Sequence, residues 1–265
     1  VSEQGIGDTL QFMRYIKVFK DQGLNIKFCA ETKLHSLIKA SGIDLSPLNH
    51  KDGSQITEGQ WMPLMSIPRH LKVSPTNPIK TEPYIRTSDK LTQKWATLLS
   101  PGPKPLIGIN WKGNRKDASQ RSRNVPIESF ANLVGNTNAT FLSLQRDSQE
   151  QELKKIFSST KALKIQDKVR AIADSDSPED FHEYAAIIAN CNLVITTDTT
   201  VAHIAAGMGI TTWILLKSIP DWRWGLHSKK SFWYPTAKLF RQRHRGNWEE
   251  VMEDVNKDLE ALTEA

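Results

Sequence analysis

The chain has 265 residues, of which 38% are hydrophobic and 24% are charged, as in ordinary soluble globular proteins. This length allows one or two domains with a sizeable core. No apolar run approaches the roughly 18–20 residues that a membrane-spanning helix needs. The formal net charge of +6 is compatible with nucleic acid, anionic membrane surfaces or phosphorylated ligands. Nucleic acid is disfavoured because aromatic and basic residues do not alternate as they do in RNA-binding motifs.

The two cysteines, Cys29 and Cys191, are far apart in apolar surroundings, which favours buried reduced thiols in a cytoplasmic protein. No cysteine or histidine spacing typical of a zinc site is present. The chain begins with Val1-Ser2-Glu3-Gln4 directly before a glycine turn, where an α/β fold normally has a strand. We therefore expect the sequence to be a fragment of a longer polypeptide.

Hydrophobic periodicity predicts alternating helices and strands in residues 1–95. The expected helices cover residues 9–22, 32–40 and 88–99, and the expected strands cover 24–30 and 43–48. Residues 61–68 are apolar but interrupted by prolines, which is typical of a cleft wall rather than a central strand. The prolines at the end of 90–105 place the domain linker within that segment.

Residues 104–265 alternate more strongly. The expected strands cover 106–111, 140–144, 162–165, 193–196 and 211–216, and the expected helices cover 126–133, 149–157, 177–189, 200–208 and 248–262. Strands that alternate with helices imply right-handed crossovers and a parallel sheet. We therefore predict two doubly wound, Rossmann-like domains, 1–95 and 104–265, that face a central cleft. The last helix is a candidate to pack back on the first domain.

Ligands of open α/β sheets bind beyond the carboxyl ends of the strands, and residues 193–203 fit that rule best. An apolar strand ends there in hydroxyl groups and Asp198, and a helix follows with Thr199 or Thr200 as its first cap. A helix N-terminus has free N–H groups and a partial positive charge, which suit a pyrophosphate. His203, in the first turn, is placed to face the cleft. The alternative is that the polar residues only cap the helix and that His203 is a satisfied core residue.

The turn Gly5-Ile6-Gly7-Asp8 is a second candidate site. Gly5 and Gly7 allow the backbone to approach a ligand closely. If the loop faces the cleft, Asp8 could act as a general base that takes a proton from an acceptor hydroxyl. The alternative is a tight turn in which Asp8 caps the following helix.

A basic segment follows the first strand of the second part. Its cations are Lys112, Arg115, Lys116, Arg121 and Arg123. They could hold a diphosphate leaving group, whose negative charge grows as a glycosidic bond breaks. For most of them the alternative is a solvated loop, and Arg123 is the one expected to point inward.

Two more loops lie at the same edge of the predicted sheet. In Pro220-Asp221-Trp222-Arg223-Trp224, one indole ring could stack on a base or a sugar, and Arg223 could bind phosphate. Gln145 ends a strand at this edge and could reach the cleft as well. Several of the tryptophans in this part of the chain are expected to serve packing instead.

In this order along the chain, five segments resemble the glycosyltransferase family 9-like domain, which is related to ADP-heptose–lipopolysaccharide heptosyltransferases. The segments are 3–12, 107–114, 121–126, 198–203 and 220–224. The resemblance covers nearly the whole chain. It implies a GT-B fold and an inverting transfer from a nucleotide-diphosphate sugar, with no cofactor and no metal required. In bacterial proteins such domains often follow tetratricopeptide repeats. The resemblance also implies a role in cell-surface glycan biosynthesis.

The motifs of that family assign roles to particular residues of this chain. The resemblance implies a catalytic aspartate at Asp8 and donor phosphate contacts at four residues. These contacts are Asp198, Thr199, Thr200 and His203. Lys112, Gln145, Trp222 and Arg223 complete the expected donor site.

The chain also departs from the family pattern. The heptosyltransferases have a lysine two residues before a Trp-Pro pair, and here Arg123 precedes Asn124-Val125-Pro126. A cation is therefore kept, although its identity differs. The carboxylate that binds the donor ribose has no clear counterpart, with Gln145 or Asp147 the nearest candidates. ADP-, UDP- and GDP-sugars therefore stay open.

The resulting hypothesis has the second domain bind the donor and the first domain bind a glycan, lipid-linked or protein acceptor. Asp8 deprotonates the acceptor, while Arg123 and the helix N-terminus stabilise the leaving diphosphate. The expected location is the cytoplasm, including the inner face of the membrane. The rival hypothesis is a catalytically silent nucleotide- or glycan-binding module attached to repeats. An NAD enzyme is disfavoured because no complete G-x-G-x-x-G lies between a strand and a helix.

Overall fold

The computed structural model describes residues 1–74, 76–79, 83–99, 105–113, 122–146, 150–157 and 180–263. Its centre is a five-stranded sheet in the order β2-β1-β3-β4-β5, and each neighbouring pair is parallel. The strands are β1 Leu106–Asn110, β2 Thr140–Ser143, β3 Leu193–Thr197, β4 Thr211–Leu216 and β5 Ala237–Arg241. The predicted α/β class with a parallel sheet is thereby confirmed.

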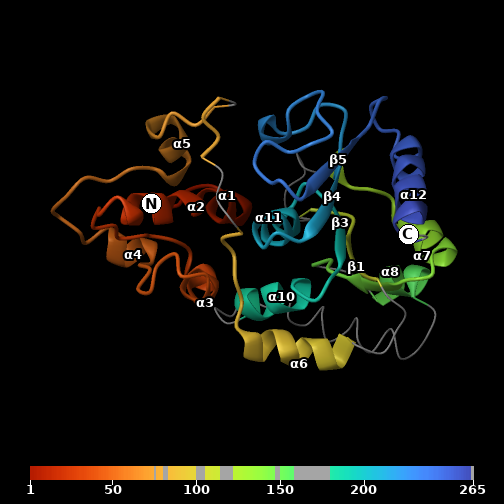
Figure 1. Ribbon diagram of the computed structural model, residues 1–265, viewed down its shortest axis with the longest axis horizontal. Coiled ribbons are helices and arrows are strands. Elements are labelled where there is room, and N and C mark those ends of the chain that lie inside the picture. The colour runs from red at the N-terminus through yellow and green to blue at the C-terminus, as the bar shows by residue number, and fades with distance from the viewer. Residues whose placement is uncertain are drawn as a thin grey trace.

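Helices cover both faces of this sheet (Figure 1). On one face lie α10 Asp180–Ile188 and α11 Thr200–Gly207. On the other lie α7 Ile127–Asn136, α8 Glu150–Ile156 and α12 Glu249–Thr263. The strands are almost fully buried because their apolar side chains enter one or the other of these two layers. The last helix, α12, packs against α7 and β5.

The N-terminal part, residues 1–79, packs on α11 through its first helix. Its helices are α1 Ile6–Phe12, α2 Arg14–Asp21, α3 His35–Ala40, α4 His50–Gly53 and α5 Ile67–His70, with single 3₁₀ turns at Thr32–Leu34 and Leu64–Ser66. The expected strands 24–30 and 43–48 are reduced to one parallel bridge between Cys29 and Leu48. The Ser2 N–H donates to the Cys29 carbonyl at 2.8 Å, so extended segments still lie side by side.

Several element boundaries differ from the expected ones. The helix expected over 9–22 begins earlier, at Ile6, and is divided into α1 and α2 at Met13. Strand β5 was not predicted, because Lys238 and Arg241 interrupt its apolar pattern. The expected strand 162–165, the helix start at 177–179 and the linker core at 100–104 lie outside the described residues.

Helix α6, Asp89–Leu99, lies against α10. The indole Nε1 of Trp95 donates to Glu183 Oε1 at 3.0 Å, and Lys94 pairs with the same carboxylate. Just before α6, the backbone N–H groups of Tyr84 and Ile85 both donate to the Gly207 carbonyl at the end of α11. This segment therefore runs between the N-terminal part and the helices of the sheet.

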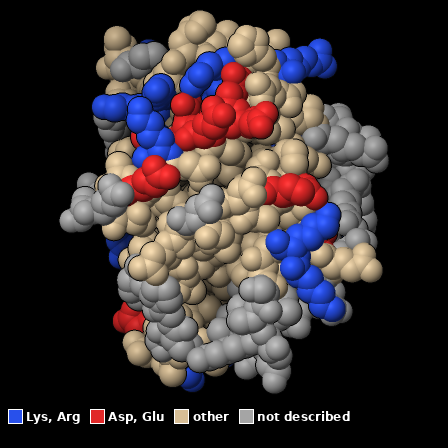
Figure 2. Space-filling model, turned by 90° about the vertical axis from the view of Figure 1, so that its right-hand side faces the viewer, with Lys and Arg blue, Asp and Glu red and all other residues tan. Residues whose placement is uncertain are grey.

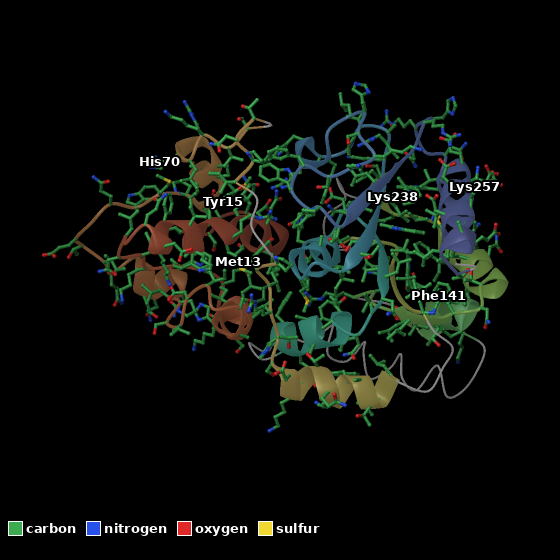
Figure 3. All side chains as sticks on the ribbon, viewed as in Figure 1. Met13, Tyr15, His70, Phe141, Lys238 and Lys257 are labelled. Atoms are coloured by element: carbon green, nitrogen blue, oxygen red, sulfur yellow. The ribbon has the colours of Figure 1, made fainter. Side chains whose placement is uncertain are left out.

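A buried polar network joins the N-terminal part to the sheet. The Arg14 guanidinium donates to the Trp233 carbonyl at 2.7 Å and to the Tyr84 hydroxyl at 3.0 Å. It also lies 4.5 Å from the ring centre of Tyr84 and 4.6 Å from that of Tyr234. The Tyr234 hydroxyl in turn lies 2.8 Å from His203 Nδ1, on α11. Met13 and Tyr15, the neighbours of Arg14 in the sequence, are labelled in Figure 3.

Burial and the positive charges of Arg14 and Arg123 lower the pKa of His203 from 6.5 to about 3. Between these pH values, the unfolded chain binds a proton at His203 that the folded chain does not. The free energy of unfolding should therefore fall as the pH falls through this window, by up to about 1.4 kcal/mol per pH unit from this residue. Urea unfolding at a series of pH values measures the slope.

In His203→Gln this part of the slope should vanish, whereas His227→Gln, at an exposed position, should keep the wild-type slope. An NMR titration of the intact protein gives a second reading that does not depend on the variant. The His203 ring should stay neutral down to pH 4. A His203 ring that titrates near pH 6.5 would contradict the network.

Candidate functional site

The site begins at the topological switch point of the sheet, between β1 and β3. The chain leaves β1 toward β2 on one side and leaves β3 toward β4 on the other, so a crevice forms at their carboxyl ends. Asn110 and Thr196 are register partners there. Asn110 Oδ1 accepts hydrogen bonds from the hydroxyls of Thr196 and Thr199, each at 3.1 Å. These hydrogen bonds form a polar network at the floor of the crevice.

This network includes Thr199, the residue directly before α11. Thr199 precedes the helix with extended backbone angles, but its side chain does not cap the helix. Its hydroxyl is committed to Asn110 instead. Thr199 is therefore the N-cap residue, as the sequence predicts, although its hydroxyl does not make the capping hydrogen bond of the alternative hypothesis. The partial positive charge at the start of α11 lies directly after the end of β3.

Asp198 lies between β3 and α11 and is surrounded by groups from other loops. Burial raises its pKa, while the charges of Arg123 and Lys217 and the Trp224 indole act in the opposite direction. The Trp224 indole N–H is directed at Asp198 but does not meet the distance and angle limits of a hydrogen bond to any described residue. The structure therefore brings Asp198, Arg123 and the loop after β4 together, as the sequence predicts.

Asp8 is paired with Arg223, across 215 positions of sequence. The other carboxylate oxygen of Asp8 accepts from the Gly5 N–H at 2.9 Å. Arg223 also donates to Asp221 Oδ1 at 2.7 Å and to Gln11 Oε1 at 2.8 Å. Asp8 therefore caps α1 and also lies beside the loop after β4.

Gly7 and His203 form the second contact between the N-terminal turn and α11. A Cβ atom on Gly7 would lie only 2.9 Å from His203 Cδ2, so the close approach depends on glycine. The His203 ring also stacks on Trp224 at 5.6 Å. His203 is buried among these groups, and its direct contact with a donor stays a prediction.

Lys112 and Gln145 have their polar atoms engaged within the protein. Lys112 Nζ lies 2.7 and 2.6 Å from the two carboxylate oxygens of Glu152. Gln145 Oε1 accepts from the backbone N–H groups of Trp111 and Lys112, and its Nε2 donates to the carbonyls of Lys112 and Arg146. Gln145 thus holds the ends of β1 and β2 together, and a donor contact from either residue stays a prediction.

Arg123, at the end of the basic segment, lies close to Gly113 and acts on Asp198. Its guanidinium covers Gly113, where an added Cβ would lie 2.7 Å from two of its nitrogens. Its Nε atom is buried and has no hydrogen-bond partner among the residues that the structure describes. Arg115, Lys116, Arg121 and Asp147 lie outside the described residues. Asn110, the last residue of β1, and Asp221, in the loop after β4, are site residues for which no role was predicted from the sequence.

The loop between β4 and β5 forms a pocket of about 400 Å³ next to this region. Its lining includes Trp222, Arg223, Trp224, Phe232 and Trp233. Trp224 is buried, whereas 60% of the Trp222 surface is exposed. The two indoles therefore have different surroundings, and only Trp222 presents a broad face to solvent.

The charges of the protein are mixed on the face that carries α12. Figure 2 shows Asp and Glu side chains gathered beside Lys and Arg side chains there. The ion pairs Arg243–Asp254 and Lys238–Asp258 belong to this region. In the described part of the chain, no group of three metal-binding side chains is found, and no helix is both long and apolar enough to cross a membrane.

The sequence matches no protein-family model. Protein FlbA of Caulobacter vibrioides is 24% identical over 174 residues, which are 65% of this chain and 28% of that protein. The chain thus spans less than a third of the length of this relative. The crystal structure of the glycosyl transferase family 9 from Veillonella parvula matches 99% of this chain and 96% of its own, with a TM-score of 0.55 and 13% identity. The chain is therefore similar in fold to a family 9 glycosyltransferase.

Proposed function

We propose that the chain is an inverting glycosyltransferase that moves a sugar from a nucleoside-diphosphate sugar to a hydroxyl acceptor and requires no metal. The observation that carries this proposal is a set of buried donors around the switch point. Arg123 Nε and Thr197 Oγ1 have no hydrogen-bond partner within the described structure, and Trp224 Nε1 is directed at Asp198. A buried donor left unpaired costs about 1–3 kcal/mol. Diphosphate oxygens are the acceptors that would satisfy such donors best.

The electrostatics of the crevice support an anionic ligand. The N-terminus of α11 and the Arg123 guanidinium both favour negative charge at the end of β3. Burial already raises the pKa of Asp198, and a phosphate beside it would raise that pKa further. A protonated Asp198 would donate to a phosphate oxygen instead of repelling it. Proton uptake on donor binding follows from this arrangement.

Asp8 is the proposed general base. In this structure both of its oxygens are engaged, one by Arg223 and one by the Gly5 N–H. A donor diphosphate near Asp198 would also lie near Asp221, which is an ion-pair partner of Arg223. The diphosphate would therefore compete with Asp8 for the Arg223 guanidinium. Asp8 then takes the proton of the acceptor hydroxyl. The acceptor oxygen bonds to the anomeric carbon, and the bond from that carbon to the diphosphate oxygen breaks.

The diphosphate leaves with the bonding electrons and is stabilised by Arg123 and by the N-terminus of α11. The acceptor class, the cytoplasmic location and the attachment to tetratricopeptide repeats in a bacterial cell-surface pathway are part of the same proposal. The fold likeness to a family 9 glycosyltransferase supports it. The engagement of both Asp8 oxygens favours one alternative, a catalytically silent nucleotide-binding module.

The donor site is tested with Arg123→Gln. Loss of a charged hydrogen-bond donor should weaken binding of the preferred nucleoside diphosphate by about ten- to 100-fold. Isothermal titration with ADP, UDP and GDP measures this change and identifies the nucleotide. Arg69→Gln, at an exposed position on α5, is the matched control and should bind like the wild type. Equal affinities in all three proteins would refute the proposed phosphate contact.

The catalytic role is tested with Asp8→Asn, which keeps an oxygen for the Gly5 N–H. Removal of a general base should lower sugar transfer by about 10²- to 10⁴-fold while nucleotide binding remains. Release of nucleoside diphosphate from a panel of nucleotide sugars, with and without acceptor extract, measures turnover. Binding without turnover in the wild type as well would favour the silent module.

A further inference from the structure

The pocket between β4 and β5 has a preformed aromatic wall. Trp222 stacks over Phe12 of α1 at 6.4 Å and meets Trp233 edge-on at 5.9 Å. Trp233 is held in turn by an edge contact with Phe232 at 4.8 Å and by its indole N–H, which donates to the Arg223 carbonyl at 3.0 Å. The wall therefore loses little conformational entropy when a ligand binds.

The shape and polarity of this pocket fit a sugar ring. Its volume of about 400 Å³ lies in the ordinary range for small-ligand sites. The C–H bonds on one side of a pyranose ring form an apolar face that packs on an indole, and the 60% exposed Trp222 offers such a surface. Ser228 and Ser231 also line the pocket and supply hydroxyl groups.

The charged side chains that line the pocket are both cations. Its described lining contains Arg223 and Lys230 but no carboxylate. Arg223 is already shared between Asp8 and Asp221, whereas Lys230 has no ion pair with any residue that the structure describes. Lys230 is exposed at the rim, where an acidic group of a ligand could reach it.

The loop that carries Lys230 is held in place by hydrogen bonds from β5. Arg241, at the end of β5, donates to the carbonyls of Trp224, Gly225 and Ser228. These three carbonyls belong to the pocket wall, so one guanidinium holds its backbone in place. The aromatic wall and the cationic rim therefore belong to one pocket whose backbone is fixed by hydrogen bonds.

The position of the pocket identifies the ligand that it would serve. Arg223 lines the pocket and pairs with Asp8, so a ring stacked on Trp222 lies next to the proposed base. The crevice that suits the diphosphate lies at β1 and β3 and meets this loop at Asp221 and Trp224, beside Asp198. We infer that the pocket is the acceptor subsite and binds the ring of an acidic saccharide between Trp222 and Lys230. Its role as acceptor rests on the proposed function, whereas saccharide binding does not.

Binding is tested with the full chain at low ionic strength. Tetragalacturonate is the acidic probe, cellotetraose is the neutral probe, and tryptophan fluorescence with isothermal titration is the readout. We expect tetragalacturonate to bind at least about tenfold more tightly than cellotetraose. Trp222→Ala should weaken binding by about tenfold or more, whereas Trp61→Ala, which removes another exposed indole, should not.

The charge preference has its own matched pair of variants. Lys230→Gln should abolish the preference for the acidic probe, and Lys257→Gln on α12 should leave it unchanged (Figure 3). Absence of saccharide binding, or equal binding by wild type and Trp222→Ala, would overturn the inference. So would a Trp222-dependent response to phosphatidylglycerol vesicles in the absence of any response to saccharides.

The same samples separate this inference from the proposed function. Titration with ADP, UDP and GDP reports on the switch-point site alone. Nucleotide binding without saccharide binding would overturn the acceptor subsite and leave the donor site standing. Saccharide binding without nucleotide binding would overturn the transferase and leave a saccharide-binding pocket.

Discussion

The buried guanidinium of Arg14 is the constraint on which the arrangement of the site depends. It is a desolvated cation whose partners are the carbonyls of Gln11 and Trp233, the Tyr84 hydroxyl and two aromatic faces. A buried charge is tolerated only if such partners remain in place. Because they come from α1, the segment before α6 and the loop before β5, their relative positions are fixed together. Arg223 and the aromatic pocket are held between these elements.

Strands β1 to β4 of the central sheet could be predicted from sequence because they are apolar runs that both helical layers bury. The rule that ligands bind at strand carboxyl ends also led to the loops that converge, including Asp198 and Arg223. The partners of these residues could not be predicted. Gln145 binds backbone groups and Lys112 binds Glu152, which follows only from the local packing of β1, β2 and α8. Arg14 and Trp233 are separated by 219 positions, so no local pattern relates them.

In the N-terminal part, strands were predicted that the structure does not form. Its apolar runs have the composition of strands, yet they form a single bridge at Cys29 and Leu48. Strand pairing depends on neighbours as well as on propensity. Strand β5 differs in the other direction, since Lys238 lies across the Trp213 and Phe240 rings and pairs with Asp258. Its long side chain packs along the sheet and keeps its charge at the surface.

The site thus combines two regions with different chemistry. The crevice at β1 and β3 gathers unpaired donors and a helix N-terminus, which suit a diphosphate. The loop after β4 gathers aromatic faces and cations, and Arg223 lies between the two regions beside Asp8. A transferase needs a donor and an acceptor held next to one base. The division of the site into these regions follows from where the strands end.

Hydrogen exchange of the intact chain, with and without the nucleoside diphosphate, tests the central claim most directly. The account predicts that added nucleotide slows exchange at the backbone N–H groups from Thr196 to Ala202, where β3 ends and α11 begins. Exchange in α12, on the other face of the sheet, should stay unchanged. Unchanged exchange at the start of α11 with saturating nucleotide, or protection confined to another region, would contradict a diphosphate site at the switch point.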